Sequence, residues 1–339
     1  MAAQLTIADL ARRLGISKAS VSYALNNQPG VGPETRERVQ TLARELGWFP
    51  SSSARALSRA KTGAIGLVMS RDPELLGTEP YFVRVLSGIE QVLIEADVSL
   101  VLRMVGPVPG RDLEVYERWA GERRVDGVIL FDARQDDLRF PLVRRLGLPA
   151  VLHSAPQESA LMPCVSGDDP NDAALVVEHL RSLGHRRIAH VTGPQVFFHE
   201  LRRRALVREQ ALQAGLQVDV VQGDYTLDGA HRLVLELLQA PEPPTGLIFA
   251  NDLMAIGGLD AAAELGISVP EQLSIVSWDD SILCQVARRG VTALDRNLTE
   301  FGRASARVLL EQIADRNPSD VVVGPSTLVV RGTSGPAPA

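Results

Sequence analysis

A short segment near the N-terminus, residues 17–26, carries small polar side chains of a kind that could recognise DNA. The hydroxyl groups of Ser20 and Ser22 could donate hydrogen bonds to phosphates, and Lys18 could reach the edge of a guanine base. A small polar surface is also what a helix needs to enter the major groove, which is about 12 Å wide. These residues favour DNA binding; the alternative is a generic three-helix cap whose hydroxyl groups are merely solvated.

Three short helices are predicted to position this segment. Thr6 can cap the first helix, with Asp9 as its capping-box partner, and Gly15 ends it. The second helix runs over 17–25, and the third has Pro33 in its first turn, a favoured place for proline. Two short helices joined at a turn that contains glycine form a helix-turn-helix.

Charge is distributed unevenly along the chain, whose formal net charge is −6 at pH 7. Residues 1–61 contain nine basic and four acidic residues, which gives this segment a net charge of +5. The remaining residues include 26 basic and 37 acidic side chains, a net charge of −11. A basic head on an acidic body indicates a polyanion-binding module at the N-terminus.

The length and composition indicate a globular protein of two or three folding units. Of the 339 residues, 45% are hydrophobic and 22% are charged. No apolar run approaches the roughly 18 residues of a membrane span, and a signal-peptide pattern is missing, so we expect a cytoplasmic protein. Two cysteines, Cys164 and Cys284, cannot form a disulfide framework, and they lack the spacing of a zinc site.

Motifs for catalysis and metal binding are missing from the sequence. The six histidines lack the H-E-x-x-H spacing. Aspartate pairs such as Asp279-Asp280 seldom supply two metal ligands, because adjacent residues of an extended chain point to opposite faces. The patterns G-x-G-x-x-G, G-x-x-x-x-G-K-[ST] and G-x-S-x-G do not occur as strand-associated motifs. We therefore expect no metal, no cofactor and no enzyme; an enzyme fused to the head is a poor second choice.

Beyond residue 62 the pattern changes to apolar runs that alternate with amphipathic helices. This alternation predicts doubly wound parallel sheets, and about eight strands in roughly 270 residues favour two Rossmann-like lobes over one large sheet. Ligands of such sheets bind beyond the carboxyl ends of the strands. The predicted strands are 64–69, 100–105, 127–131, 150–153, 187–192, 218–222, 246–250 and 275–278.

Two polar residues directly follow predicted strands and could hold a small molecule. Asn251 and Asp279 are both placed where a bound polyol could reach them. Their side chains could accept hydrogen bonds from, or donate them to, neighbouring hydroxyl groups.

Aromatic residues near the predicted strand ends could stack against a sugar ring or a base. They are Tyr81, Phe82, Phe131, Phe197, Phe198, Tyr225 and Trp278. The alternative is a place in a lobe core, which we favour for Phe82 and Phe131. Both interpretations stay open for Tyr225 and Trp278.

Two N-terminal segments resemble the DNA-binding head of the lactose-repressor (LacI/GalR) family of bacterial transcription regulators. They are LTIADLARRLGISKASVSYALNN and VGPETRERVQTLARELGWFPSSSARALS, which follow one another closely in the first 60 residues. The resemblance implies that 17–26 form the recognition helix, with Lys18, Ala19 and Tyr23 at base-reading positions. Tyr23 stands where many members carry Arg, so the bidentate guanine contact of an arginine is not available there.

The resemblance assigns DNA contacts to two parts of the head. A helix-turn-helix domain over 1–50 would contribute Thr6, Ser17, Lys18, Ala19, Ser20, Ser22, Tyr23 and Asn26. A hinge helix in the linker 51–61, ordered only on operator DNA, would contribute Ser51, Ala54, Arg55 and Leu57. Leu57 would act as a wedge in the minor groove, where an apolar side chain between base steps kinks the duplex.

Fragments of the body, such as ANDLMAIG (250–257) and SWDD (277–280), extend the resemblance to a body similar to periplasmic sugar-binding proteins. The resemblance implies an effector-binding domain over 62–332 whose chain passes between two lobes three times. The first lobe would comprise about 62–161 and 293–320, the second about 162–292 and 321–332, and 333–339 would be a disordered tail.

The resemblance also adds residues to the effector site. The family's Arg-x-x-Gly-Phe motif places Arg204 as the guanidinium that clamps ligand oxygens, although the Gly-Phe pair is lost here. Because Arg202 and Arg203 directly precede Arg204, the assignment of the clamp to Arg204 stays open by one residue. His153 ends a strand on the pocket side, and Ser154 occupies a position where many members carry Asp. The predicted effector site is Tyr81, Phe82, Phe131, His153, Ser154, Phe198, Arg204, Tyr225, Asn251, Trp278 and Asp279.

These observations together predict a ligand-responsive DNA-binding regulator, most often a repressor in this family, that binds a near-palindromic operator as a homodimer. The expected effector is a sugar or sugar derivative in the cleft between the lobes; a nucleoside is the alternative. A plain solute-binding protein would explain the body but leave the head unexplained.

Overall fold

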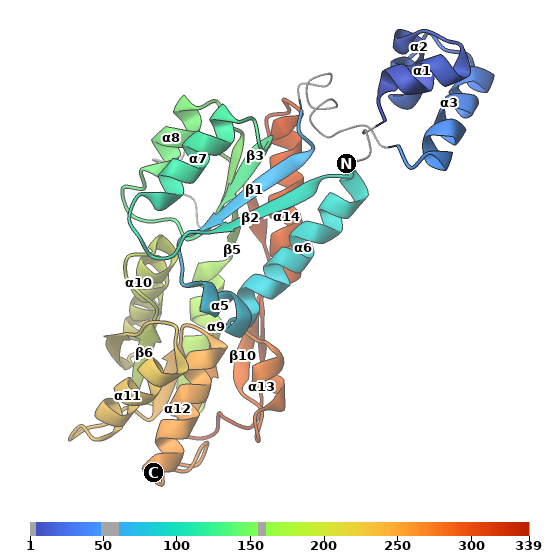
Figure 1. Cartoon of the computed structure of the whole chain (residues 1–339). Helices are drawn as coiled ribbons and strands as arrows, with labels where there is room; N and C mark the ends of the chain where they lie inside the picture. The colour runs from blue at the N-terminus through green and yellow to red at the C-terminus, as the bar shows by residue number, and fades with distance from the viewer. Residues whose placement is uncertain (1–4, 49–60, 155–160, 339) are drawn as a thin grey trace. The chain divides into compact units, whose positions relative to one another are not determined.

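The computed structural model describes residues 5–48, 61–154 and 161–338 (Figure 1). The chain forms two units that divide between Thr62 and Gly63, here called the head and the body. In the described residues, no helix is long and apolar enough to cross a membrane.

The described residues 5–48 of the head form a bundle of three helices, as predicted: α1 (Ile7–Leu14), α2 (Lys18–Leu25) and α3 (Pro33–Glu45). The backbone N–H of Thr6 donates to the Asp9 carboxylate at 3.0 Å, which fixes the start of α1. Gly15 ends α1 at φ 66°, a left-handed conformation that glycine adopts without strain. A small apolar core of Leu10, Ala11, Val21, Ala24, Val39 and Ala43 holds the helices together.

The first lobe of the body is built on a six-stranded parallel sheet with the order β11-β5-β4-β3-β1-β2. Its strands are β1 (Ala64–Met69), β2 (Ser99–Met104), β3 (Gly127–Leu130), β4 (Ala150–His153), β5 (Cys164–Gly167) and β11 (Val321–Val323). Its helices are α5 (Pro73–Thr78), α6 (Pro80–Ala96), α7 (Arg111–Gly121), α8 (Arg139–Arg145) and α14 (Leu298–Ile313).

The central strands β1, β3 and β4 of this sheet are buried on both faces. Ile65 and Leu67 of β1 pack with α6 and α14 on one face. Ala64 and Val68, which alternate with them, pack with α7 and α8 on the other. Near-continuous apolar runs are typical of such doubly covered parallel strands.

The second lobe repeats this plan with the strand order β12-β10-β9-β8-β6-β7, in which only β12 is antiparallel to its neighbour. Its strands are β6 (Arg187–Thr192), β7 (Gln217–Gln222), β8 (Gly246–Phe249), β9 (Ser274–Ser277), β10 (Thr292–Asp295) and β12 (Thr327–Val329). Its helices are α9 (Asp169–Ser182), α10 (Phe198–Gln213), α11 (Leu227–Leu238), α12 (Asp252–Glu264) and α13 (Ile282–Val286).

All eight predicted strands are confirmed to within one residue at each end. The predicted two-lobed, doubly wound architecture is confirmed as well. The predicted lobe boundaries are wrong by a few residues. Strands β5 and β11 belong to the first sheet, and β10 belongs to the second. The chain therefore passes between the lobes only after each of these short strands is complete, near residues 168, 296 and 325.

The predicted disordered tail is also wrong, because the structure describes residues 333–338 as a packed strap on the second lobe. The Thr333 hydroxyl is buried and donates to the carbonyl of Ile275 at 2.8 Å. Further along the strap, the N–H of Ala337 donates to the carbonyl of Leu183 at 2.8 Å. Glycine and proline disfavour regular helices and strands, but the other backbone groups of such a segment can still form hydrogen bonds to the lobe.

Candidate functional site

The candidate DNA-reading surface lies on α2 of the head. Ser17 caps this helix, since its Oγ accepts a hydrogen bond from the N–H of Ser20 at 3.0 Å. Lys18 and Ala19 in its first turn are exposed, and the Tyr23 side chain is 43% exposed. The three base-reading positions of the prediction are therefore free to contact a partner.

The other predicted DNA contacts of the helix-turn-helix domain are less uniform. Thr6 is exposed, but Ser20 and Ser22 are half-buried. Asn26 uses its side-chain N–H to donate to the carbonyl of Ser22 at 2.9 Å, which ends the helix. The hinge positions of the prediction, Ser51, Ala54, Arg55 and Leu57, lie outside the described residues.

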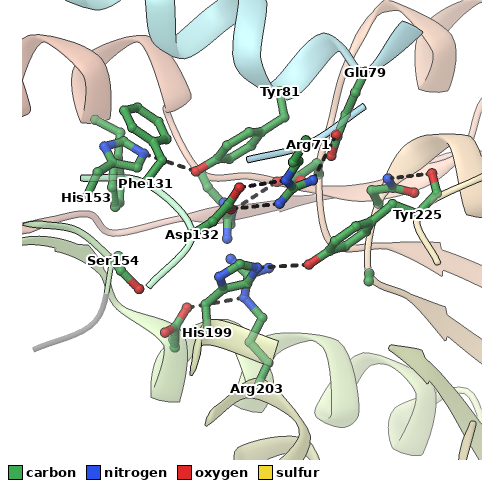
Figure 2. A pocket seen from close by; sticks show the side chains of 17 residues that line it. Arg71, Glu79, Tyr81, Phe131, Asp132, His153, Ser154, His199, Arg203 and Tyr225 are labelled. Carbon is green, nitrogen blue, oxygen red and sulfur yellow. Dashed lines mark hydrogen bonds and ion pairs between the residues drawn. The ribbon is translucent and has the colours of Figure 1, made fainter. Parts of the chain in front are cut away.

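In the body, side chains from both lobes line one pocket at the carboxyl ends of the strands (Figure 2). They leave a cavity of about 50 Å³ between them. The lining residues are Arg71, Glu79, Tyr81, Phe131, Asp132, His153, Ser154, Gly167, Asp169, His199, Arg203, Tyr225, Ala250, Asn251, Asp279, Arg296 and Phe301.

A buried arginine lies at the centre of the first lobe's share of the pocket. Arg71 follows β1, and its guanidinium donates to both Oδ atoms of Asp132, which follows β3, at 2.6 and 2.7 Å. A third hydrogen bond, from Nη1, reaches Oε2 of Glu79 at 3.2 Å. Strands β1 and β3 are neighbours at the point where the strand order of the sheet reverses, the usual ligand position of a doubly wound sheet.

The two carboxylates around Arg71 differ in their proton affinity. Burial alone would raise the pKa of Asp132, but the charge and the hydrogen bonds of Arg71 outweigh this effect and hold that pKa below 3.8. Burial dominates at Glu79 and raises its pKa to about 7, although Arg71 opposes the shift. Asp132 is therefore the permanent counter-ion of Arg71 at neutral pH, and Glu79 exchanges its proton in that range.

An uncharged histidine closes the first lobe's side of the pocket. His153 lies 3.0 Å by its Nε2 from the Tyr81 hydroxyl and 2.8 Å by its Nδ1 from Oγ of Ser305. Its ring stacks on Phe131 with the centroids 4.1 Å apart, and Phe301 packs edge-on against it. Burial lowers the pKa of His153 to about 3, so the imidazole is neutral at physiological pH.

The arginine that lines the second lobe's share of the pocket is Arg203. Its guanidinium lies 3.6 Å from Asp169 and 5.3 Å from the ring centroid of Trp278. Arg204, the predicted clamp, is exposed and does not line the pocket, so that assignment is wrong by one residue. Successive residues of a helix point about 100° apart, and position 203 is the one on the inner face of α10.

Hydrogen bonds join the remaining polar groups of the second lobe. The Tyr225 hydroxyl donates to buried Glu200 at 2.9 Å and lies 2.9 Å from Nε2 of His199. Asn251 caps α12 by accepting from the N–H of Met254 at 2.9 Å, while it also lines the pocket. Asp279 lies 3.1 Å from Nε of Arg296, so the predicted polyol-binding carboxylate already has a cationic partner.

Seven of the predicted effector residues line the pocket: Tyr81, Phe131, His153, Ser154, Tyr225, Asn251 and Asp279. Besides Arg204, three others do not. Phe82 is a core residue beneath Arg71, as the core interpretation favoured, and Trp278 is fully buried behind Arg203. Phe198 packs against the first lobe, because its N–H donates to the carbonyl of Ala133 at 2.7 Å.

Sequence reasoning missed several ionisable residues of the pocket, among them Arg71, Glu79, Asp132, Asp169, His199 and Arg296. Arg71 and Asp132 carry the same signal that identified Asn251, since both lie just beyond a predicted strand. Among the described residues, no group of three or more His, Cys, Asp or Glu side chains is arranged to hold a metal ion.

A helix-turn-helix head joined to two doubly wound lobes with a polar pocket between them defines a class of DNA-binding regulators. Residues 6–51 match the family described as bacterial regulatory proteins, lacI family, and residues 177–334 match a periplasmic binding protein-like domain. The HTH-type transcriptional regulator MalR of Streptomyces coelicolor is 32% identical to this chain, over 98% of this chain and 97% of MalR.

Two solved structures are similar over almost the whole chain. A complex of the transcriptional regulator CelR with cellobiose has a TM-score of 0.74 at 28% identity, over 97% of this chain and 99% of CelR. The Lac repressor dimer bound to operator and the anti-inducer ONPF has a TM-score of 0.86 at 24% identity, over 98% of this chain and 99% of that repressor. At this level of identity the likeness concerns the fold alone.

The chain belongs to the lacI family of bacterial regulatory proteins, as the N-terminal resemblance predicted, and is a DNA-binding transcriptional regulator. The relatives named above are transcriptional regulators and not enzymes.

Proposed function

We propose that the protein is a non-enzymatic, cytoplasmic repressor that binds a near-palindromic operator as a homodimer and responds to a neutral sugar in the pocket between its lobes. The observation that carries this proposal is that the pocket takes side chains from both lobes, including Asp132 from the first and Asp279 from the second. A ligand that contacts both lobes favours their closed arrangement, and this is the conformational difference an effector needs.

The charges of the pocket favour an uncharged ligand. Arg71, Arg203 and Arg296 each lie within ion-pairing distance of a carboxylate. An anionic ligand would have to displace these carboxylates, whereas the hydroxyl groups of a sugar can both accept from the guanidinium groups and donate to the carboxylates. Tyr81, Phe131 and Tyr225 offer ring faces for the apolar side of a sugar. The structure of CelR with cellobiose makes a disaccharide the first choice.

Ligand pockets commonly have volumes of roughly 300–1,000 Å³. The cavity of about 50 Å³ is far below that range. A sugar therefore requires the lobes to separate and close again around it. This motion couples the pocket to the head only if the effector has different affinities for the two lobe arrangements.

Exposed apolar side chains on the body support the homodimer. On α6, the side chains of Val83 and Ile94 are 56% and 74% exposed, and on α13 those of Ile282 and Val286 are 60% and 69% exposed. Large exposed apolar groups of this kind are typical of protein interfaces. In a dimer, two heads would read half-sites about one helical turn of DNA apart.

A thermal-shift screen of the full chain tests the effector class. The panel contains cellobiose, maltose, their monosaccharides, phosphorylated sugars and nucleosides. A ligand that binds only the native state must raise the melting temperature. We expect a neutral sugar to raise it and the phosphorylated form of the same sugar not to do so. A rise with nucleosides alone would replace the sugar with the alternative effector, and a rise with phosphorylated sugars alone would contradict the charge argument.

A further inference from the structure

Arg71 lines the effector pocket from the first lobe, and it also contacts aromatic rings of the second lobe. Its side chain is 7% exposed, and its guanidinium is fixed by hydrogen bonds to Asp132 and Glu79 of its own lobe. These bonds hold a permanent cation at the cleft between the lobes (Figure 2).

Three aromatic rings surround this cation. The central guanidinium carbon lies 4.9 Å from the ring centroid of Phe82, 4.9 Å from that of Phe197 and 4.7 Å from that of Tyr225. A cation within about 6 Å of an aromatic centroid is attracted to the ring, and most strongly where both groups are out of water. Phe82 belongs to the first lobe, but Phe197 and Tyr225 belong to the second.

The second lobe holds its two rings firmly in place. Tyr225 is fixed by its hydrogen bond to Glu200, and Phe197 stacks against Tyr225 with the centroids 6.2 Å apart. Next to this cluster, the N–H of Phe198 donates to the carbonyl of Ala133 in the first lobe. Separation of the lobes would break this backbone bond and remove two rings from Arg71, while the bonds to Asp132 and Glu79 would remain.

We propose that Arg71 is a positioning residue that helps to hold the lobes closed, because it presents a cation of one lobe to an aromatic pair of the other. This inference rests on the proposed function in one respect: closure is the step that the effector controls. Arg71 then determines how much of the closed arrangement is populated before the effector binds. Effector affinity depends on that population, since only the closed arrangement forms the complete pocket.

Hydrogen exchange at the Phe198 amide tests this proposal without effector or DNA, because its bond to Ala133 crosses between the lobes. The full chain is compared with Arg71→Met, which keeps the length of the side chain but removes its charge, and with Arg71→Lys, which keeps the charge. Phe197→Leu removes one ring of the aromatic pair and leaves both carboxylates paired. Leu309→Val is the control, because Leu309 is buried in the core of the first lobe beside Gly127, at the start of β3 and away from Phe198.

We expect the Phe198 amide to exchange at least tenfold faster in Arg71→Met and in Phe197→Leu, a moderate increase in Arg71→Lys, and no change in Leu309→Val. Amides of the central strands β1 and β8 should keep their protection. In the combined variant Arg71→Met with Phe197→Leu, the amide should exchange no faster than in the faster single variant. The two changes remove the same contact, that between Arg71 and Phe197.

Unchanged exchange in Phe197→Leu would overturn the proposal, even if Arg71→Met destabilises the first lobe. Multiplicative effects in the combined variant would also overturn it, because the two residues would then act independently. Neither result depends on the identity of the effector, so the proposed function is tested separately by the thermal-shift screen.

Discussion

The guanidinium of Arg71 makes two parallel hydrogen bonds, of 2.6 and 2.7 Å, to the carboxylate of Asp132. The two residues follow the adjacent parallel strands β1 and β3, so the topology of the sheet brings their side chains together. Bidentate pairing fixes the orientation as well as the position of the arginine. This pair therefore organises the first lobe's half of the pocket.

Replacement of Asp132 by Asn should destabilise the body by about 3 kcal/mol, because it leaves a buried guanidinium without its main counter-ion. Since Arg71 holds the pKa of Asp132 below 3.8, this stabilisation is present above about pH 4 and is lost as the pH falls through the lowered pKa. Urea unfolding at pH 7 and pH 3 measures both effects. Asp136→Asn, an exposed change in the same loop, is the control. Equal stability of the two variants at pH 7 would contradict the structural role of the pair.

His153 should make the body less stable as the pH falls below about 6.5. Its pKa of about 3 in the folded protein lies below the value of 6.5 in the unfolded chain, so protonation favours unfolding. Between pH 6.5 and pH 5 this amounts to about 2 kcal/mol. The variant His153→Asn should lose less stability than the wild type over this interval, by about that amount, in urea unfolding. The same pH dependence in both proteins would indicate that His153 is solvated.

Two adjacent arginines of α10 should behave differently. Arg203→Ala should reduce the response of operator binding to the sugar found in the thermal-shift screen by tenfold or more, because Arg203 lines the pocket and Arg204 is exposed. Arg204→Ala is the matched control and should respond as the wild type does. Effector titrations of operator-bound protein measure both variants. A loss of response in Arg204→Ala alone would restore the assignment made from sequence.

The C-terminal strap should be needed for the stability of the second lobe. Deletion of residues 333–339 leaves the buried backbone N–H groups of Ile275 and Thr292 without their partner Thr333. Each buried polar group left unsatisfied costs about 1–3 kcal/mol, so we expect a loss of roughly 3 kcal/mol in urea unfolding. Deletion of 338–339 alone should have little effect. Equal stabilities of the two deletions would show that the strap contributes nothing.

Lys18 should read one position of each operator half-site. Lys18→Ala should relax the preference at that position by about 1–3 kcal/mol, because the exposed side chain lies in the first turn of the recognition helix. Binding to operators with each base pair changed in turn measures the preference. Weaker binding to every sequence by the same factor would mean that Lys18 contacts a phosphate instead.

Much of the fold was predictable because its long strands are apolar and its helices are amphipathic. Strand β11 (Val321–Val323), which the sequence did not reveal, has only three residues and therefore no usable periodicity. The lobe boundaries were wrong for the same reason. The strap was missed because its contacts are hydrogen bonds of backbone and hydroxyl groups, which no hydrophobic pattern indicates.

The pocket was predictable where a residue directly follows an obvious strand. Asn251 and Asp279 were found by this rule, and Arg71 and Asp132 satisfy it but were not considered. Glu79 and Arg203 could not be found in this way. Along the chain Glu79 lies between the helices α5 and α6 and not at the end of a strand. The choice between Arg203 and its neighbour depends on the rotation of a helix about its axis.

The central claim is that the pocket of the body controls DNA binding by the head, and operator binding with and without effector tests it most directly. Fluorescence anisotropy of the full chain on a labelled near-palindromic operator should give a Kd that changes by about 5–150-fold when the sugar from the thermal-shift screen is saturating. The same sugar should leave the Kd of Arg203→Ala unchanged. A sugar that raises the melting temperature but leaves the Kd of the wild type unchanged would contradict the claim.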